Sequence, residues 1–140
     1  MTSQGVNNII NKGAFMSACV LWIDSEHAKV FKISATGIVK KQLSHHSVNP
    51  IGSRHDQHKI NAENNFFHEV ALSIGLTEEL LILGAGLAKN HFKNHLESHH
   101  HQELHKHIVG MEALDSVSDN QILEFSRKFF KKYNTYNSAI

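Results

Sequence analysis

The sequence predicts a single α/β domain, built on one mixed five-stranded sheet with the element order β-β-β-α-β-α-β-α. Three short apolar runs, separated by turn residues, occupy the first third of the chain. Beyond them, strand-like apolar runs alternate with segments of helical period. Such alternation implies parallel strands joined by right-handed crossovers. We expect a flexible leader at 1–15, the domain at 16–134 and a C-terminal tail at 135–140.

Three consecutive strands open the predicted domain. The runs ACVLWID (18–24), AKVFKIS (28–34) and GIVKKQL (37–43) contain the residues that strands favour, and turn residues separate them. The segment 44–63 that follows is polar and holds the single proline. Its length predicts an exposed loop, a kind of segment that often carries function.

Helical period then begins. The first predicted helix has one apolar face, and Gly75 is placed to end it. The apolar run ELLIL (79–83) predicts the fourth strand. A second helix is expected from 87 to about 100, because Ala88, Phe92 and Leu96 recur at a spacing of four residues.

The last two elements are a strand and a helix. The run HIVGME (107–112) predicts the fifth strand. Ser118 and Gln121 form a capping-box pair, which marks the start of the last helix. Basic residues load the end of this helix, where they suit the helix dipole and offer a nonspecific electrostatic face; they include Lys128, Lys131 and Lys132.

Composition points to an ordinary globular protein, with 41% hydrophobic and 19% charged residues. The single cysteine, Cys19, excludes an internal disulfide and favours a reducing, cytoplasmic location; its apolar run indicates a core residue. No apolar run approaches the roughly 20 residues of a membrane span. The net charge is only +1, but protonation of all 13 histidines would bring it to +14.

Gly84-Ala85-Gly86 follows the fourth predicted strand and raises the question of phosphate binding. Position 89 is Lys, so neither G-x-G-x-x-G nor a P-loop is present, which argues against a nucleotide site. Two interpretations remain. Free amides at the helix start, with Lys89 nearby, would seat one backbone phosphate. Alternatively, the glycines only allow a tight turn and close packing.

The segments LLILGAGLAKNHFKNHL and VLWIDSEHAKVFKIS resemble the middle domain of archaeal and eukaryotic class-I peptide-release factors and of Pelota. Asp24, Ala28 and Val30 match the D-x-x-x-A-x-[VI] pattern of that domain's opening hairpin. The resemblance covers about residues 16–134 and is closest to the small stand-alone bacterial relatives, often described as translational machinery components. It implies a translation-associated domain with the ribosome or RNA as partner and without a cofactor.

The loop before the first helix departs from this family. Release factors carry Gly-Gly-Gln there, whereas this loop reads NPIGSRHDQHK, with a single Gly52 and no glycine pair before Gln57. Peptidyl-tRNA hydrolysis by that mechanism is therefore not expected, and we assign no catalytic residue. The loop instead offers a compact cationic tip for phosphate contact, formed by Arg54, His55, His58 and Lys59.

Two alternative functions are open. The element order is also similar to the ribonuclease-H-like arrangement, where carboxylates hold metal ions for hydrolysis. Asp24 and Glu69 would supply two of them, and Asp115 or Asp119 would have to replace an acid missing from the fourth strand. A metal- or pH-responsive interaction protein is the other alternative. His91, His95 and His99 recur at four-residue spacing, which predicts a solvent-facing stripe beside the core able to chelate zinc, copper or nickel.

Overall fold

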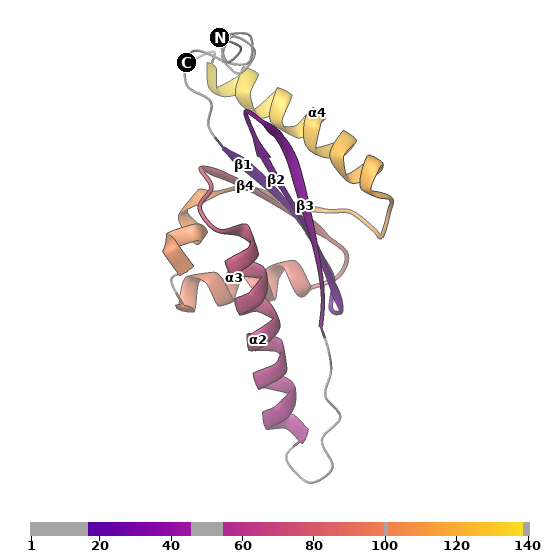
Figure 1. Cartoon of the computed structure of the whole chain (residues 1–140), viewed down its shortest axis with the longest axis vertical. Coiled ribbons are helices and arrows are strands. Elements are labelled where there is room, and N and C mark those ends of the chain that lie inside the picture. The colour runs from indigo at the N-terminus through magenta and orange to yellow at the C-terminus, as the bar shows by residue number, and fades with distance from the viewer. Residues whose placement is uncertain (1–16, 46–54, 100, 139–140) are drawn as a thin grey trace.

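A computed structural model describes residues 17–45, 55–99 and 101–138 of the chain; for 55–61, 101–102 and 135–138 it describes the backbone alone. The predicted order of strands and α-helices is confirmed in these residues (Figure 1). The elements are β1 Ala18–Ile23, β2 His27–Ser34, β3 Gly37–Ser44, α2 His55–Ile74, β4 Glu79–Gly84, α3 Ala88–His99, η1 His101–His107, β5 Ile108–Ala113 and α4 Asp119–Ser138.

The sheet is mixed and five-stranded, with the spatial order β3-β2-β1-β4-β5. Antiparallel pairing joins β1, β2 and β3 into two hairpins. The chain then crosses over, so that β4 runs parallel to β1, and β5 runs parallel to β4. The predicted mixed sheet, with antiparallel strands first and parallel strands later, is therefore confirmed.

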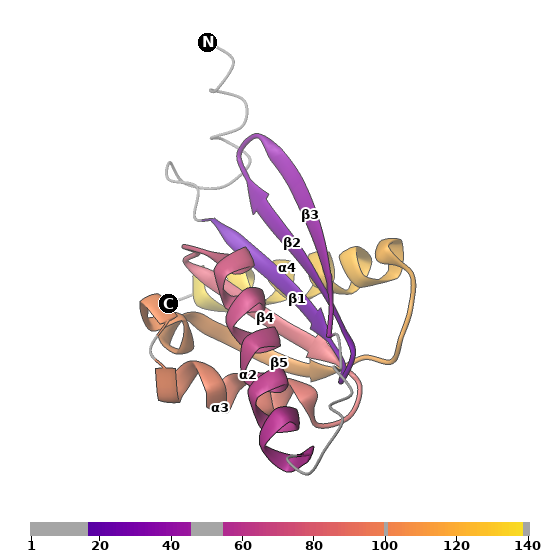
Figure 2. The ribbon, with the colours of Figure 1, turned by 60° about the horizontal axis from the view of Figure 1, so that its bottom comes forward.

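Helices cover both faces of the sheet. Helices α2 and α3 lie on one face and α4 on the other, as Figure 2 shows. Because side chains alternate along a strand, β1 serves both cores: Cys19, Leu21 and Ile23 pack toward α2 and α3, whereas Val20 and Trp22 pack toward α4. Strand β4 is buried on both faces, which explains why it reads as an uninterrupted apolar run.

Helix α4 is fixed to the sheet by a few large side chains. The indole Nε1 of Trp22 donates to the carbonyl of Leu114, 2.9 Å away, just before the helix begins. Gly110 of β5 makes room for Phe129, because a Cβ there would lie 2.6 Å from the ring. The predicted capping box is present, since the Ser118 amide donates to Gln121 Oε1 at 3.0 Å.

Two boundaries differ from the sequence-based prediction. The expected loop over 44–63 is too long, because α2 already begins at His55. The first turns of α2 extend beyond the sheet (Figure 1), so no core imposes an apolar period on that stretch of sequence. In addition, the histidine-rich stretch before β5 forms the 3-10 helix η1, which the sequence pattern does not predict. Helix α2 ends at Ile74 as expected, and Gly75 follows with a φ of 62°.

Within the described residues, no helix is both long enough and apolar enough to cross a membrane. The leader expected at 1–15 lies outside them. Helix α4 continues to Ser138, so the first residues of the expected tail are helical.

Candidate functional site

The amino-terminal end of α2 forms a projecting tip. A helix of 20 residues is about 30 Å long, and the first turns of α2 extend past every strand in both ribbon views (Figures 1 and 2). Positions 58 and 59 lie one helical turn after position 55, and all three belong to a helix rather than to the loop that the sequence predicts. The fourth predicted residue, Arg54, lies outside the described residues.

The Gly84-Ala85-Gly86 turn is built for close packing. A Cβ on Gly84 would lie 2.0 Å from the carbonyl oxygen of Ile23, so only glycine lets the end of β4 approach β1 here. Gly86 has a φ of 67°, a conformation that favours glycine, but a Cβ there would meet nothing within 4 Å. The turn therefore has a structural reason for its first glycine that requires no ligand.

Lys89 closes the same turn. Its Nζ donates to the carbonyl of Gly86 at 2.7 Å, and the amide of Asn90 donates to the carbonyl of Leu87. The ammonium group thus lies beside the helix start, where a phosphate would sit. To contact a phosphate directly, the Lys89 ammonium group would donate to the phosphate in addition to the Gly86 carbonyl, or in place of it.

The histidine stripe of α3 is split between core and solvent. His95 is buried, with 6% of its surface exposed, and does not face solvent as the sequence predicts. Its ring lies edge-on to Phe67 of α2 and is stacked on His99 at a centroid distance of 4.1 Å. The reason is the packing of α2 against α3, which covers the middle of the stripe. His91 remains exposed, with its Nδ1 3.8 Å from Glu63 Oε2.

The carboxylates of the nuclease hypothesis are not brought together. Asp24 caps the β1–β2 turn by accepting from the amides of Glu26 and His27, at 2.8 and 2.6 Å. Glu69 lies on α2 and Asp119 on α4, on opposite faces of the sheet (Figure 2). Among the residues that the structure describes, no three His, Cys, Asp or Glu side chains form a group able to hold a metal ion.

Asp119 forms an ion-pair bridge instead. Its carboxylate oxygens lie 3.1 Å from Lys29 Nζ and 2.5 Å from Lys40 Nζ, which ties the start of α4 to β2 and β3. The hydrogen bond from Lys40, more than any other contact, lowers the pKa of the Asp119 carboxyl. Asp119 therefore has a structural role, and its negative charge is compensated by the two lysines.

Cys19 is a core residue, as its apolar run indicates. It is fully buried, and burial raises the pKa of its thiol to about 12, although Lys32 acts in the opposite direction. The thiol is therefore protonated and inert rather than nucleophilic.

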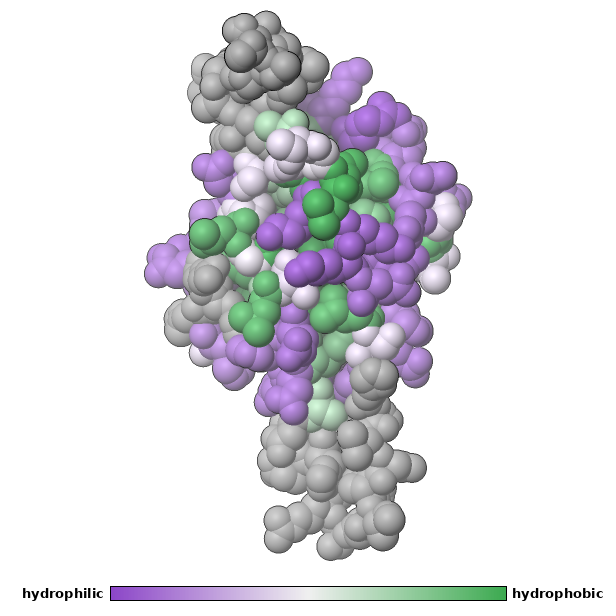
Figure 3. All heavy atoms as spheres, in the orientation of Figure 1, coloured by the Kyte–Doolittle hydropathy of each residue, from purple (hydrophilic) through white to green (hydrophobic). Residues whose placement is uncertain are grey.

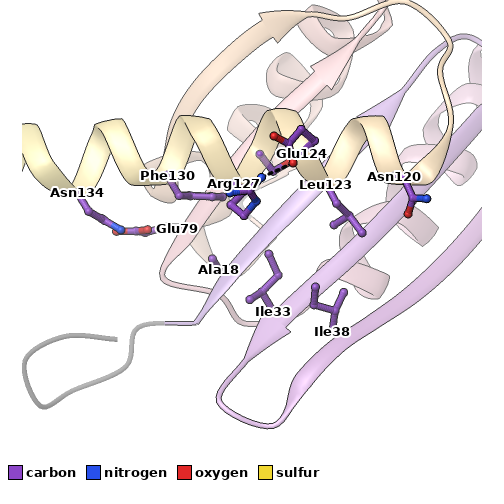
Figure 4. Close-up of a pocket in the computed structure, with 11 residues that line it drawn as sticks. Ala18, Ile33, Ile38, Glu79, Asn120, Leu123, Glu124, Arg127, Phe130 and Asn134 are labelled. Atoms are coloured by element: carbon purple, nitrogen blue, oxygen red, sulfur yellow. Dashed lines mark hydrogen bonds and ion pairs between the residues drawn. The ribbon is translucent and has the colours of Figure 1, made fainter. Parts of the chain in front are cut away.

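A groove between α4 and the sheet is a feature that the sequence analysis missed. The cavity measures about 540 Å³ and is lined by apolar side chains of β2, β3 and α4, by polar and charged side chains of α4 that include Glu124 and Arg127, and by Glu79 at one end (Figure 4). Burial raises the pKa of Glu79, and the neighbouring Glu78 adds to the effect. No local pattern signals this groove, because its walls come from segments far apart in the chain; they include Ile33, Ile38, Leu123 and Phe130.

Several large apolar side chains are exposed at the surface. Figure 3 shows apolar patches among polar atoms between α4 and α2. The large hydrophobic residues that are more than half exposed are Ile38, Val39, Leu72, Leu76 and Leu87. Two of these five lie next to each other on β3, at the edge of the sheet.

The described residues adopt a fold that is also found in release-factor-like translation proteins. It matches solved structures with a mixed sheet and helices of the same arrangement, although no protein-family model and no curated protein matches the sequence. The fold expected from the resemblance is thereby confirmed.

Three solved structures illustrate the match. Pelota from Archaeoglobus fulgidus superposes with a TM-score of 0.57 at 20% identity, over 86% of this chain and 32% of Pelota. Pelota from Thermoplasma acidophilum gives 0.55 at 15% identity, over 79% and 31%. An archaeal translation termination factor gives 0.50 at 13% identity, over 88% and 41%. The chain thus spans about a third of the length of the Pelota proteins.

Proposed function

We propose that this chain is a translation-associated domain that binds the ribosome or RNA in the cytoplasm and does not hydrolyse peptidyl-tRNA. The observation that carries the proposal is the fold shared with Pelota and an archaeal translation termination factor, over most of this chain. A shared fold does not identify a contact surface, which depends on the residues that this chain exposes.

The contact surface in this proposal is the tip of α2. Arg54, His55, His58 and Lys59 lie within six residues of sequence, and the last three belong to the end of a helix that extends past the sheet. Arg54 and Lys59 carry positive charge at neutral pH, and the two histidines add to it when protonated. Anions also favour a helix amino terminus, because its unpaired amides point outward. Charge and helix orientation therefore act in the same direction on an approaching phosphate.

Two further basic regions would add to the electrostatic attraction. Lys89 lies at the start of α3 and would steady one phosphate in exchange for its bond to Gly86. On α4, Lys128, Lys131 and Lys132 are exposed, and Lys128 is partly neutralised by Glu124, 3.6 Å away. We assign these residues nonspecific attraction rather than recognition.

The sequence and the backbone together support the proposal that the chain does not hydrolyse peptidyl-tRNA. Gln57 is not preceded by two glycines, and it lies in the first turn of α2. A helical backbone does not supply the Gly-Gly conformational freedom that the resemblance associates with catalysis. The proposed role is binding.

The test is co-sedimentation of the protein with bacterial ribosomes at low and moderate salt. We expect comigration that survives moderate salt, together with binding to single-stranded RNA. The double substitution Arg54→Ala with Lys59→Ala should weaken RNA binding and reduce the slope of log K against log salt by about 1.4, which corresponds to two lost phosphate contacts.

A matched control removes the same charge elsewhere. Lys93→Ala with Lys106→Ala deletes a partly exposed lysine on α3 and an exposed one on η1, each of which pairs with a glutamate of its own element. This control should leave affinity and slope close to those of the unmodified protein. Equal effects of the two double substitutions would remove the α2 tip from the proposal, and a lack of comigration at both salt concentrations would overturn the ribosome partner.

A further inference from the structure

Strand β3 presents an open backbone edge. It is an edge strand of the sheet, and no described segment pairs with its outer side. It is eight residues long, and seven of them are exposed. Natural proteins usually shorten, bend or cover such an edge, or place lysines on it as β3 does at Lys40 and Lys41, because its free N–H and C=O groups form a template for another strand. The long β3 edge therefore offers a site for strand addition.

The register shows which backbone groups point outward. The amide of His45 donates to the carbonyl of Glu26 at 2.7 Å, so residues 26 and 45 form a hydrogen-bonded pair. Bonded and non-bonded pairs alternate along an antiparallel ladder. The register then leaves the N–H and C=O groups of Ile38, Lys40 and Gln42 directed away from β2, about 7 Å apart from one to the next.

On the α4 side, this edge opens into the apolar groove. Ile38 is 52% exposed and lies at the mouth of the cavity of about 540 Å³, beside Ile33 and Leu123 (Figure 4). A strand added outside β3 would place every second side chain on this side of the sheet. On the same side, Lys40 and Lys29 share the single carboxylate of Asp119, so one net positive charge remains there. Around Ile38, Ile33 and Leu123, this side therefore suits apolar side chains, and polar residues of α4 line the rest of the groove.

On the α2 side, the edge is cationic. A second cavity of about 270 Å³ is lined by Lys32 and Lys41, together with Val39 and Leu76. In contrast to Lys29 and Lys40, neither Lys32 nor Lys41 forms an ion pair within the part of the chain that the structure describes. The alternate side chains of an added strand would meet this side, where carboxylates complement the two ammonium groups.

We propose that the outer edge of β3 binds an extended segment of a partner protein in which apolar and acidic residues alternate. The apolar set packs on Ile38 and the α4 groove, the acidic set faces Lys32 and Lys41, and the backbone pairs with the edge. A second copy of this chain is disfavoured, because antiparallel pairing of two β3 strands centred on Lys40 or on Lys41 would place that lysine opposite the same lysine of the other copy. This interface is additional to the proposed RNA contact on α2.

The test uses proline to delete one outward amide. A short acetylated and amidated peptide of alternating valine and glutamate is titrated into the full chain and followed by fluorescence anisotropy. Gln42→Pro removes an outward N–H and leaves the β2–β3 ladder intact, whereas Gln42→Ala keeps the amide. We expect Gln42→Ala to bind like the unmodified chain and Gln42→Pro to bind about tenfold more weakly.

A charge exchange gives an independent readout should Gln42→Pro fail to fold. Lys41→Glu should weaken binding of the valine–glutamate peptide at least tenfold and improve binding of a valine–lysine peptide of the same length. Equal binding by folded Gln42→Pro and Gln42→Ala, or a Lys41→Glu chain that does not discriminate between the peptides, would overturn the proposal. So would self-association of the chain, abolished by Gln42→Pro, in the absence of peptide binding, because β3 would then pair with a second copy.

Discussion

At the scale of single residues, the two glycines of the β4–α3 turn have different reasons to be glycine. Gly84 faces the Ile23 carbonyl at a distance no side chain tolerates, whereas Gly86 needs only its positive φ. A substitution at Gly84 must move backbone, and one at Gly86 must only adopt an unfavourable dihedral angle. Gly84 is thus required for close packing, and Gly86 is required for the backbone conformation of the turn.

This difference predicts unequal stability losses. Gly84→Ala should lower the free energy of unfolding by about 3 kcal/mol or more, because β4 must move away from β1. Gly86→Ala should cost roughly 1 kcal/mol, the usual penalty of a left-handed alanine. Urea unfolding of the two variants measures both. Losses of the same size would mean that the close approach of Gly84 to Ile23 does not determine the cost of a side chain at position 84.

At the scale of elements, α4 is attached to the sheet by a few aromatic contacts and by the Asp119 bridge to Lys29 and Lys40. The pKa of Asp119 is lowered, chiefly by the hydrogen bond from Lys40. A carboxyl with a lowered folded pKa contributes stability that is complete above its ordinary pKa of 3.8 and is lost as pH falls through the folded value.

Removing the bridge should therefore have a pH-dependent effect. Asp119→Asn should destabilise the protein at pH 7 by about 0.5–1 kcal/mol, a range set by screening of partly exposed charges, and the difference should vanish at a pH below the folded pKa. Urea unfolding at both pH values measures this. Glu124→Gln is the control, since it breaks pairs within α4 alone and should change stability less. A difference that persists at low pH would indicate a loss unrelated to charge.

At the scale of the whole molecule, charge depends strongly on pH. The formal charge of +1 at neutral pH stands beside 13 histidines, so acidification makes the protein a polycation. Attraction to a polyanion should follow that change, with more counterions released on binding. The effect belongs to the molecule rather than to one site, because the histidines are spread from β2 to η1.

Binding to single-stranded RNA should accordingly tighten between pH 7.5 and 5.5, and the slope of log K against log salt should become steeper. Anisotropy titrations at several salt concentrations measure both quantities, with circular dichroism showing that the fold is retained. Because His95 is buried between Phe67 and His99, its replacement by Leu should leave the change in slope intact. The same slope at pH 7.5 and pH 5.5 would mean that histidine charge does not contribute to RNA binding.

Local sequence determined the elements of this protein. Apolar alternation and turn residues located the strands, Gly75 ended α2, and Ser118 with Gln121 began α4, because each of these signals acts within a few residues of chain. The order of elements and the mixed sheet followed from them. The family resemblance likewise rested on short contiguous segments around Gly84 and Asp24.

Tertiary structure alone decided which residues meet. The burial of His95 depends on Phe67, the Asp119 bridge joins residues 79 and 90 positions apart, and the α4 groove combines β2, β3 and α4. The polar start of α2 lies beyond the core, so no apolar period marked it. These features escaped prediction because periodicity reports which face of one element is apolar, whereas packing selects the partner that covers it.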